Sequence, residues 1–196
     1  MDATLVGFLE KVAKFGEDND ARETARPKRM LNITATRAVC SGSSSGRWAP
    51  PGYWRGTSNA FSTMWLADAA RSTGGRVTTL ELNPEKIALA RANLATAGLD
   101  GVVDIIEGRA ADTLAALPGP LDLVFFDADR ASYLAYLELV VPKLRSGGML
   151  IADNVTSHAQ ELQDYLRRVK DHPQLFTVTV PIGNGEEITM KMGDGT

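Results

Sequence analysis

The sequence predicts a doubly wound α/β fold, a mostly parallel sheet with helices on both faces and an antiparallel hairpin at its C-terminal end. From Ser62 onward, segments of strand character alternate with segments of helical periodicity, which is typical of a parallel sheet. Several predicted strands are almost continuously apolar, as in LDLVFF at 121–126, and this favours burial on both faces. The last two strands flank Gly183-Asn184-Gly185, a turn sequence that lets them pair as a hairpin.

Periodicity and chain-breaking residues define the individual elements. Apolar residues at helical spacing predict an amphipathic helix over 3–16. The helix that opens with Pro84 is expected to end at Gly98, because Pro suits a first helical turn and Gly the position past the last. The remaining helices are predicted over 62–72, 111–117, 131–144 and 159–171. Strands are predicted over 76–81, 102–107, 121–126, 148–153, 175–181 and 186–192.

Composition excludes several classes of protein. The chain has 196 residues and a net charge of -3, which suits one soluble domain over 1–196 and argues against a nucleic-acid binder. No apolar run approaches the ~18 residues of a membrane helix, and Asp2 and Glu10 are unlike a secretory signal. Cys40 is the single cysteine and the two histidines lie far apart, which excludes an internal disulfide and argues against a zinc site. We therefore expect a cytoplasmic protein without a membrane or nucleic-acid partner.

Acidic or glycine-containing segments follow successive predicted strands. Ligands of such sheets bind at the carboxyl ends of the strands, so these residues are expected on one edge. Any single one of them is better explained as a helix cap or a solvated turn, but their succession favours a binding site. In chain order they are Gly56 after the first expected strand, then Glu81, Glu107, Asp127 with Asp129, and Asp153 with Asn154.

Glu81 is placed to accept hydrogen bonds from ribose hydroxyls, in a nicotinamide dinucleotide or in S-adenosylmethionine. A dinucleotide site needs the G-x-G-x-x-G pattern, but only Gly56 is present, with Ala60 four residues later. S-adenosylmethionine has no phosphate and tolerates a looser turn. The pattern thus favours S-adenosylmethionine over a nicotinamide-dependent reductase.

Asp127, Asp153 and Asn154 provide oxygen donors at neighbouring strand ends. Hard divalent cations such as Mg²⁺ take ligands of this kind and keep positions open for substrate. The alternative is that Asp153 and Asn154 cap the following helix.

Three segments carry a family resemblance. VTTLELNPEKIALARANLATAGL, FFDADRASYLAYL and GGMLIADNV resemble the metal-dependent class I O-methyltransferases of the catechol and caffeoyl-CoA type, whose fold is Rossmann-like. The resemblance implies methyl transfer from S-adenosylmethionine to a phenolic oxygen of a small molecule. It also implies a divalent cation, expected to be Mg²⁺, that lowers the pKa of the substrate hydroxyl. It assigns the metal to Asp127, Asp153 and Asn154. It assigns cofactor contacts to Gly56, Thr57, Ser62, Glu81, Ala110, Asp127 and Asp129, with Glu81 on the ribose and Ala110 beside the adenine.

Two positions depart from the family pattern. Arg130 stands where many members have a Lys that acts as the base. A guanidinium stays protonated and is therefore a poor acceptor for the phenol proton. We expect Arg130 to act as a fixed cation that stabilises a phenolate, or else to be a surface residue. Trp54 stands where the family has a Glu at the cofactor. These departures leave open a catalytically weak or inactive protein of the same fold.

Residues 35–55 lack Leu, Ile, Glu, Asp and Lys and do not fit the pattern around them. Moving the codon boundary by one base allows PGYWR to become R-V-L-E, a strand sequence that ends next to Gly56. We therefore hypothesise that this segment is translated out of frame, although the freedom of codon choice offers an alternative. As written, its Gly and Pro break regular structure, so we expect 38–51 to be irregular and at most Gly52 to Arg55 to occupy the first strand, at a cost in stability and cofactor affinity.

The sequence does not identify the substrate. The loop after Asn154 is short, and His158 near it is either a surface residue or a substrate contact. Relatives in the family are often dimers, so a homodimer stays an open expectation.

Overall fold

The computed structural model describes residues 3–25, 28–30, 32, 57–127 and 129–193, in which helices and strands alternate as the sequence predicts. The described helices are α1 (Ala3–Arg22), α3 (Phe61–Thr73), α4 (Pro84–Thr96), α5 (Ala110–Ala116), α6 (Tyr133–Val140) and α7 (Gln163–Asp171). The described strands are β1 (Val77–Glu81), β2 (Val103–Glu107), β3 (Leu121–Phe126), β4 (Leu144–Asp153), β5 (Leu175–Val180) and β6 (Glu186–Lys191).

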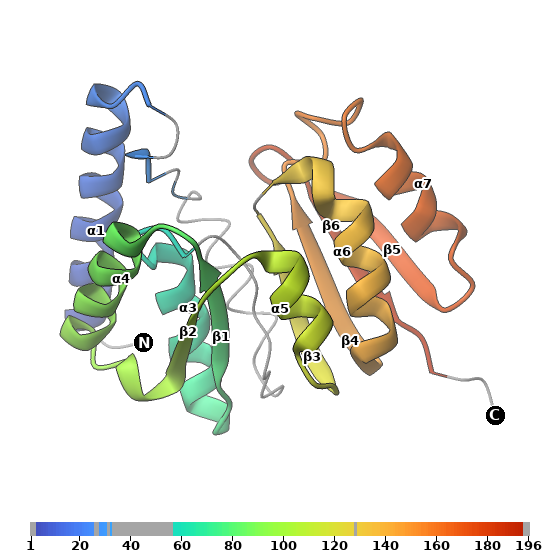
Figure 1. Ribbon diagram of the computed structural model, residues 1–196, viewed down its shortest axis with the longest axis horizontal. Helices are drawn as coiled ribbons and strands as arrows, with labels where there is room; N and C mark the ends of the chain where they lie inside the picture. The colour runs from blue at the N-terminus through green and yellow to red at the C-terminus, as the bar shows by residue number, and fades with distance from the viewer. Residues whose placement is uncertain (1–2, 26–27, 31, 33–56, 128, 194–196) are drawn as a thin grey trace.

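The described strands form two groups. β1 and β2 pair in parallel, and the second group has the order β3-β4-β6-β5, with β3 parallel to β4 and the C-terminal strands antiparallel. Figure 1 shows α1, α3 and α4 with the first group and α5, α6 and α7 with the second. The predicted α/β class and the C-terminal hairpin are confirmed. The expectations for 38–51, for Gly52 to Arg55 and for Gly56 lie outside the described residues.

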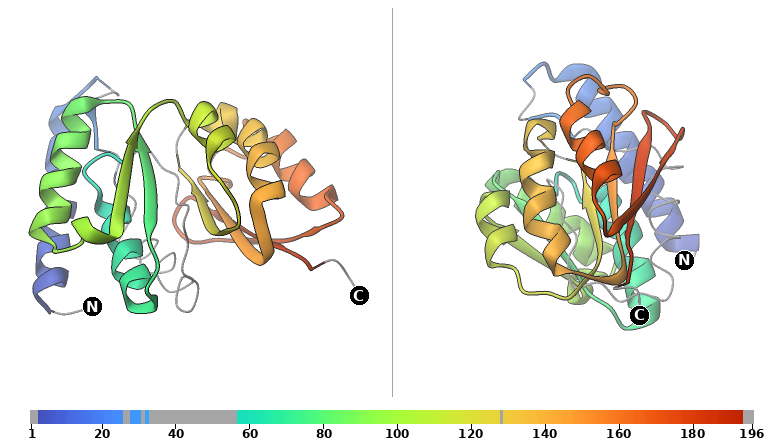
Figure 2. Two further views of the ribbon diagram at one scale, coloured as in Figure 1. Left: turned by 60° about the horizontal axis from the view of Figure 1, so that its bottom comes forward. Right: turned by 90° about the vertical axis from the view of Figure 1, so that its right-hand side faces the viewer.

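Apolar side chains cover both faces of β3. Leu123 and Phe125 join one buried cluster with residues of α1 and α3, while Val124 and Phe126 join a second with residues of α6 and α7. Successive side chains of a strand point to opposite faces, so a continuous apolar run serves both clusters. Figure 2 shows α6 and α7 side by side over the sheet of β3 to β6. Among the described residues, no helix combines the length and apolar composition that a bilayer crossing needs.

Several boundaries differ from the predicted ones. The helix predicted over 131–144 is α6 between two 3₁₀ turns, Arg130–Ser132 and Val141–Lys143, the second of which contains Pro142 near its start. Proline cannot donate the hydrogen bond that would continue α6, and this explains the early end. The helix predicted over 159–171 begins only at Gln163, after a series of turns.

The N-terminal helix and the fourth strand are longer than predicted. α1 continues beyond the predicted end at 16 to Arg22. Its last turns are mostly polar and are not buried, so apolar periodicity does not reveal them. β4 begins at Leu144 rather than at 148 and includes Gly147 and Gly148. Glycines in a strand weaken the pattern that would identify it.

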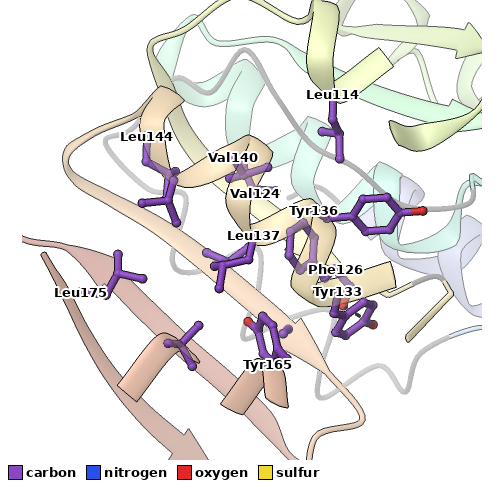
Figure 3. Close-up of a cluster of buried hydrophobic side chains, with 14 of the residues drawn as sticks. Leu114, Val124, Phe126, Tyr133, Tyr136, Leu137, Val140, Leu144, Tyr165 and Leu175 are labelled. Carbon is purple, nitrogen blue, oxygen red and sulfur yellow. Dashed lines mark hydrogen bonds between the residues drawn. The ribbon is translucent and has the colours of Figure 1, made fainter. Parts of the chain in front are cut away.

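An aromatic cluster fills the second core. The Phe126 and Tyr133 ring centroids lie 5.3 Å apart, and those of Tyr133 and Tyr165 lie 5.7 Å apart (Figure 3). The Tyr133 hydroxyl donates a hydrogen bond of 2.9 Å to the Phe126 carbonyl. The buried Tyr165 hydroxyl finds no hydrogen-bond partner in the described part of the chain. Burial, and secondarily the charge of Glu187, raise the pKa of this hydroxyl.

The Tyr133 hydroxyl makes a hydrogen bond and the Tyr165 hydroxyl makes none in the described part of the chain, so we predict opposite effects on stability for the two Tyr→Phe substitutions. Tyr165→Phe removes a hydroxyl that is buried without a hydrogen bond, so its desolvation is not compensated. We expect the free energy of unfolding to rise by about 1 kcal/mol. Tyr133→Phe removes the hydrogen bond that the hydroxyl donates to the Phe126 carbonyl, and we expect the free energy of unfolding to fall by about 1 kcal/mol. Urea unfolding of the two variants measures both, and a loss in Tyr165→Phe equal to that in Tyr133→Phe would contradict the prediction.

Candidate functional site

Glu81, the last residue of β1, is held by backbone N–H groups. Its Oε2 accepts a hydrogen bond from the Ser58 N–H at 3.0 Å. Its Oε1 accepts from the N–H groups of Leu82 and Asn83 at 2.9 and 3.0 Å. The carboxylate therefore has a fixed orientation, and each oxygen has two lone pairs, so Oε2 retains capacity for a further donor.

The turn before α3 is joined to β1. The Thr57 hydroxyl lies 2.9 Å from that of Thr79 and donates to the Leu80 carbonyl at 3.1 Å. Ser58 and Ala60 adopt positive φ angles of 49° and 65°, a strained conformation for residues with a side chain that often occurs at binding sites. Thr57 is buried, and its two hydroxyl contacts with β1 anchor the turn beside Glu81.

Two serines lie at this turn and at the start of α3. Ser62 is buried in the first turn of α3. Ser58 was missed by the sequence analysis, yet its N–H binds Glu81 and its hydroxyl donates to the Met30 carbonyl at 2.6 Å. No local pattern marks Ser58, because both contacts are distant in the chain. Gly56, the remaining residue predicted for this turn, lies outside the described residues.

A pocket of about 380 Å³ lies beside Glu81. It brings Glu81, Ala110 and Asp129 together, three residues predicted as cofactor contacts that follow three different strands. The Asp129 Oδ2 accepts a hydrogen bond of 2.8 Å from the Ser132 hydroxyl. Sequence reasoning missed other residues of the lining, which are Leu80, Leu82, Gly108, Arg109, Ala111, Ser132, Ala135 and Tyr136. A pocket of this volume suits a small organic ligand.

The three residues predicted as metal ligands lie at the ends of β3 and β4. The Asn154 Nδ2 donates to the Asp127 Oδ1 at 3.2 Å, and the Asn154 N–H donates to the Asp153 Oδ1. Asp153 is buried, and Asn154 has a positive φ of 67°. The described residues contain no group of three or more His, Cys, Asp or Glu side chains that could share a metal ion. The predicted set differs from such a group, because its third member is an amide.

Arg130 is held by an ion pair. Its Nε lies 2.9 Å from the Glu161 Oε2, and the two side chains are 18% and 42% exposed. The pair joins the segment after β3 to the turns before α7. Arg130 is therefore no freely moving surface residue. In the turns before α7, the Nδ1 of half-buried His158 lies 2.8 Å from the hydroxyl of its neighbour Ser157.

Comparisons with known proteins give matches over much of the chain. A family model described as a methyltransferase domain matches residues 52–155. A catechol O-methyltransferase from Mycobacterium tuberculosis is 37% identical over 158 residues, which cover 79% of this chain and 69% of that protein. A catechol O-methyltransferase from Niastella koreensis is 37% identical over 113 residues, which cover 56% of this chain and about half, 51%, of that protein.

Among solved structures, cofactor-bound Rv0187 from MTB superposes with a TM-score of 0.79 at 29% identity, over 93% of this chain and 89% of that one. An O-methyltransferase from Bacillus cereus in complex with SAH also has a TM-score of 0.79, at 24% identity over 94% of this chain and 90% of that one. At that lower identity the likeness concerns the fold alone.

Proposed function

The chain belongs to the S-adenosylmethionine-dependent O-methyltransferases, since the methyltransferase-domain model matches 52–155 and a catechol O-methyltransferase is 37% identical over 79% of the chain. From this premise we propose that the protein methylates a hydroxyl of a small catechol-like substrate with the help of a divalent cation. The observation that carries this proposal is the pocket that joins Glu81, Ala110 and Asp129.

Glu81 would bind the ribose of S-adenosylmethionine. Three backbone N–H groups already orient its carboxylate, so little conformational freedom is lost when ribose hydroxyls donate to it. Ala110 opens α5 in the same pocket and leaves room for a flat adenine ring. Asp129 would face the cofactor from the segment after β3.

Asp127, Asp153 and Asn154 would hold the cation. Two carboxylates and an amide oxygen are donors that a hard cation such as Mg²⁺ prefers, so the chemistry of the set fits the group. When bound, the cation would lower the pKa of the substrate hydroxyl. The hydrogen bond of 3.2 Å between Asn154 and Asp127 supports the assignment, because it brings two of the three side chains together.

Arg130 would stabilise the phenolate and would not act as a base. A guanidinium keeps its proton throughout the working pH range. Glu161 engages the Nε, while the terminal amino groups carry further N–H donors that can face a substrate oxygen. The ion pair thereby orients a permanent positive charge near the expected oxyanion.

The first prediction concerns cofactor affinity. Glu81→Gln replaces a carboxylate oxygen with an N–H donor that cannot accept from ribose, and we expect roughly tenfold or greater loss of S-adenosylmethionine affinity. Isothermal titration measures this affinity. Glu107→Gln is the matched control, because Glu107 pairs with Glu81 in the β1–β2 register but does not line the pocket. Equal affinities in the two variants would remove Glu81 from the cofactor site.

The second prediction concerns the reaction itself. With S-adenosylmethionine and a panel of catechols, we expect methylated product in the presence of Mg²⁺ and its loss with a chelator, because the cation acidifies the hydroxyl. Mass spectrometry of the product measures transfer, and added Mg²⁺ should restore it. Cofactor binding without product would favour the alternative of a catalytically weak or inactive protein. Full activity in the chelator would contradict the metal assignment.

The third prediction separates the charge of Arg130 from its structural role. Arg130→Met removes the charge, and we expect roughly ten- to hundredfold lower kcat with an unchanged KM for the cofactor. Arg130→Lys keeps a cation and should retain more of kcat than Arg130→Met. Glu161→Gln is the control, since it removes the negative partner and leaves the charge at position 130. If Arg130→Met loses no more kcat than Glu161→Gln, Arg130 has a structural role only.

A further inference from the structure

The tip of the C-terminal hairpin is docked on the segment that follows Asn154. The Thr156 and Ser157 N–H groups both donate to the Asn184 carbonyl at 3.0 Å, and the Val155 N–H donates to the Gly185 carbonyl at 3.1 Å. The contact leaves no room at Gly185, which has a φ of +90° and where a Cβ atom would lie 2.0 Å from the Thr156 Oγ1. The hairpin tip therefore has a fixed position relative to the end of β4.

Side chains extend this contact towards the predicted metal ligands. The Asn184 Nδ2 donates to the Asn154 Oδ1 at 3.1 Å. The Asn154 Nδ2 in turn donates to the Asp127 Oδ1 at 3.2 Å. A chain of two hydrogen bonds thus connects the exposed hairpin tip with a carboxylate at the end of β3.

The direction of these hydrogen bonds follows from the charge of Asp127. A carboxylate accepts hydrogen bonds only, so in the absence of a cation the Asn154 amide must direct its NH₂ group towards Asp127. Its oxygen is then directed to Asn184, which supplies an N–H donor. A hard cation takes the amide oxygen instead, and Asn154 must present the opposite end of the same amide to it.

An asparagine at position 184 can satisfy both orientations. The Asn184 Nδ2 donates when Asn154 directs its oxygen towards Asn184. The Asn184 Oδ1 accepts when Asn154 directs its NH₂ group towards Asn184 and its oxygen towards the cation. We propose that Asn184 is a positioning residue of the cation site, which holds Asn154 and exchanges donor for acceptor when the cation binds. This inference rests on the cation site of the proposed function and deepens it. It also explains why the hairpin tip is packed so tightly against the segment after β4.

The proposal makes a directional prediction for Asn184→Asp. A carboxylate at this position only accepts hydrogen bonds, so it favours the Asn154 orientation that offers the amide oxygen to a cation. We therefore expect about tenfold tighter cation binding, the lower end of the effects that groups orienting a metal ligand have. Asn184→Ala removes the partner of Asn154 and should weaken cation binding by about tenfold. The backbone contacts of residue 184 persist in both variants.

Titration of the cofactor-free protein with Mn²⁺, followed by electron paramagnetic resonance, measures this binding independently of activity. Gly183→Asp is the charge control, because it adds the same charge one residue away, and its φ of +58° is one that Asp tolerates. Asn154→Ala is combined with Asn184→Asp to test whether the effect passes through Asn154. We expect the Mn²⁺ affinity of Gly183→Asp to change by less than threefold. We expect Asn184→Asp to give no gain in Mn²⁺ affinity when it is added to Asn154→Ala.

Three outcomes would overturn the proposal. If Asn184→Asp gains no more than Gly183→Asp, or if its gain persists in the Asn154→Ala background, the effect is general electrostatics and Asn184 has no positioning role. The cation site itself would then stand. If the unaltered protein binds no Mn²⁺, the cation site of the proposed function fails, and the inference fails with it.

Discussion

The burial of β3 and β4 on both faces is the constraint on which the rest of the structure depends. From Leu123 to Phe126 the side chains of β3 alternate between two apolar cores, so neither face of this stretch accommodates a polar group. Polar chemistry is thereby displaced to the residues that follow the strands, and Asp127 is the first of them after β3. Since β3 and β4 run in parallel, the carboxyl end of β4 brings Asp153 and Asn154 to the same edge.

The candidate site combines two kinds of support at this edge. Glu81 is oriented by backbone N–H groups, which every residue except proline provides. Asn154 and Arg130 are oriented by side chains of distant segments, through Asn184 and Glu161. We infer that the cofactor side of the site tolerates changes of neighbouring side chains, whereas the cation side depends on two individual side chains.

The C-terminal hairpin has a structural and a local role. β6 pairs with β4 and places Glu186 opposite Asp153, so it completes the sheet next to the predicted cation ligands. Its tip contacts the segment after Asn154 through backbone hydrogen bonds. The strand pairing and the tip contact are linked, because a shift in the register of β6 would move Asn184 away from Asn154.

The sequence by itself determined the order and class of the elements, because apolar periodicity and the positions of Pro and Gly are local properties. It also indicated a set of residues that end or closely follow an identifiable strand, which are Glu81, Asp127, Asp129, Asp153 and Asn154. Only the tertiary structure decided that Ser58 fixes Glu81, that Glu161 pairs with Arg130 and that Asn184 contacts Asn154. Each of these pairs is separated by more than twenty residues, and a hydrogen bond depends on distances of a few tenths of an ångström that no local pattern encodes.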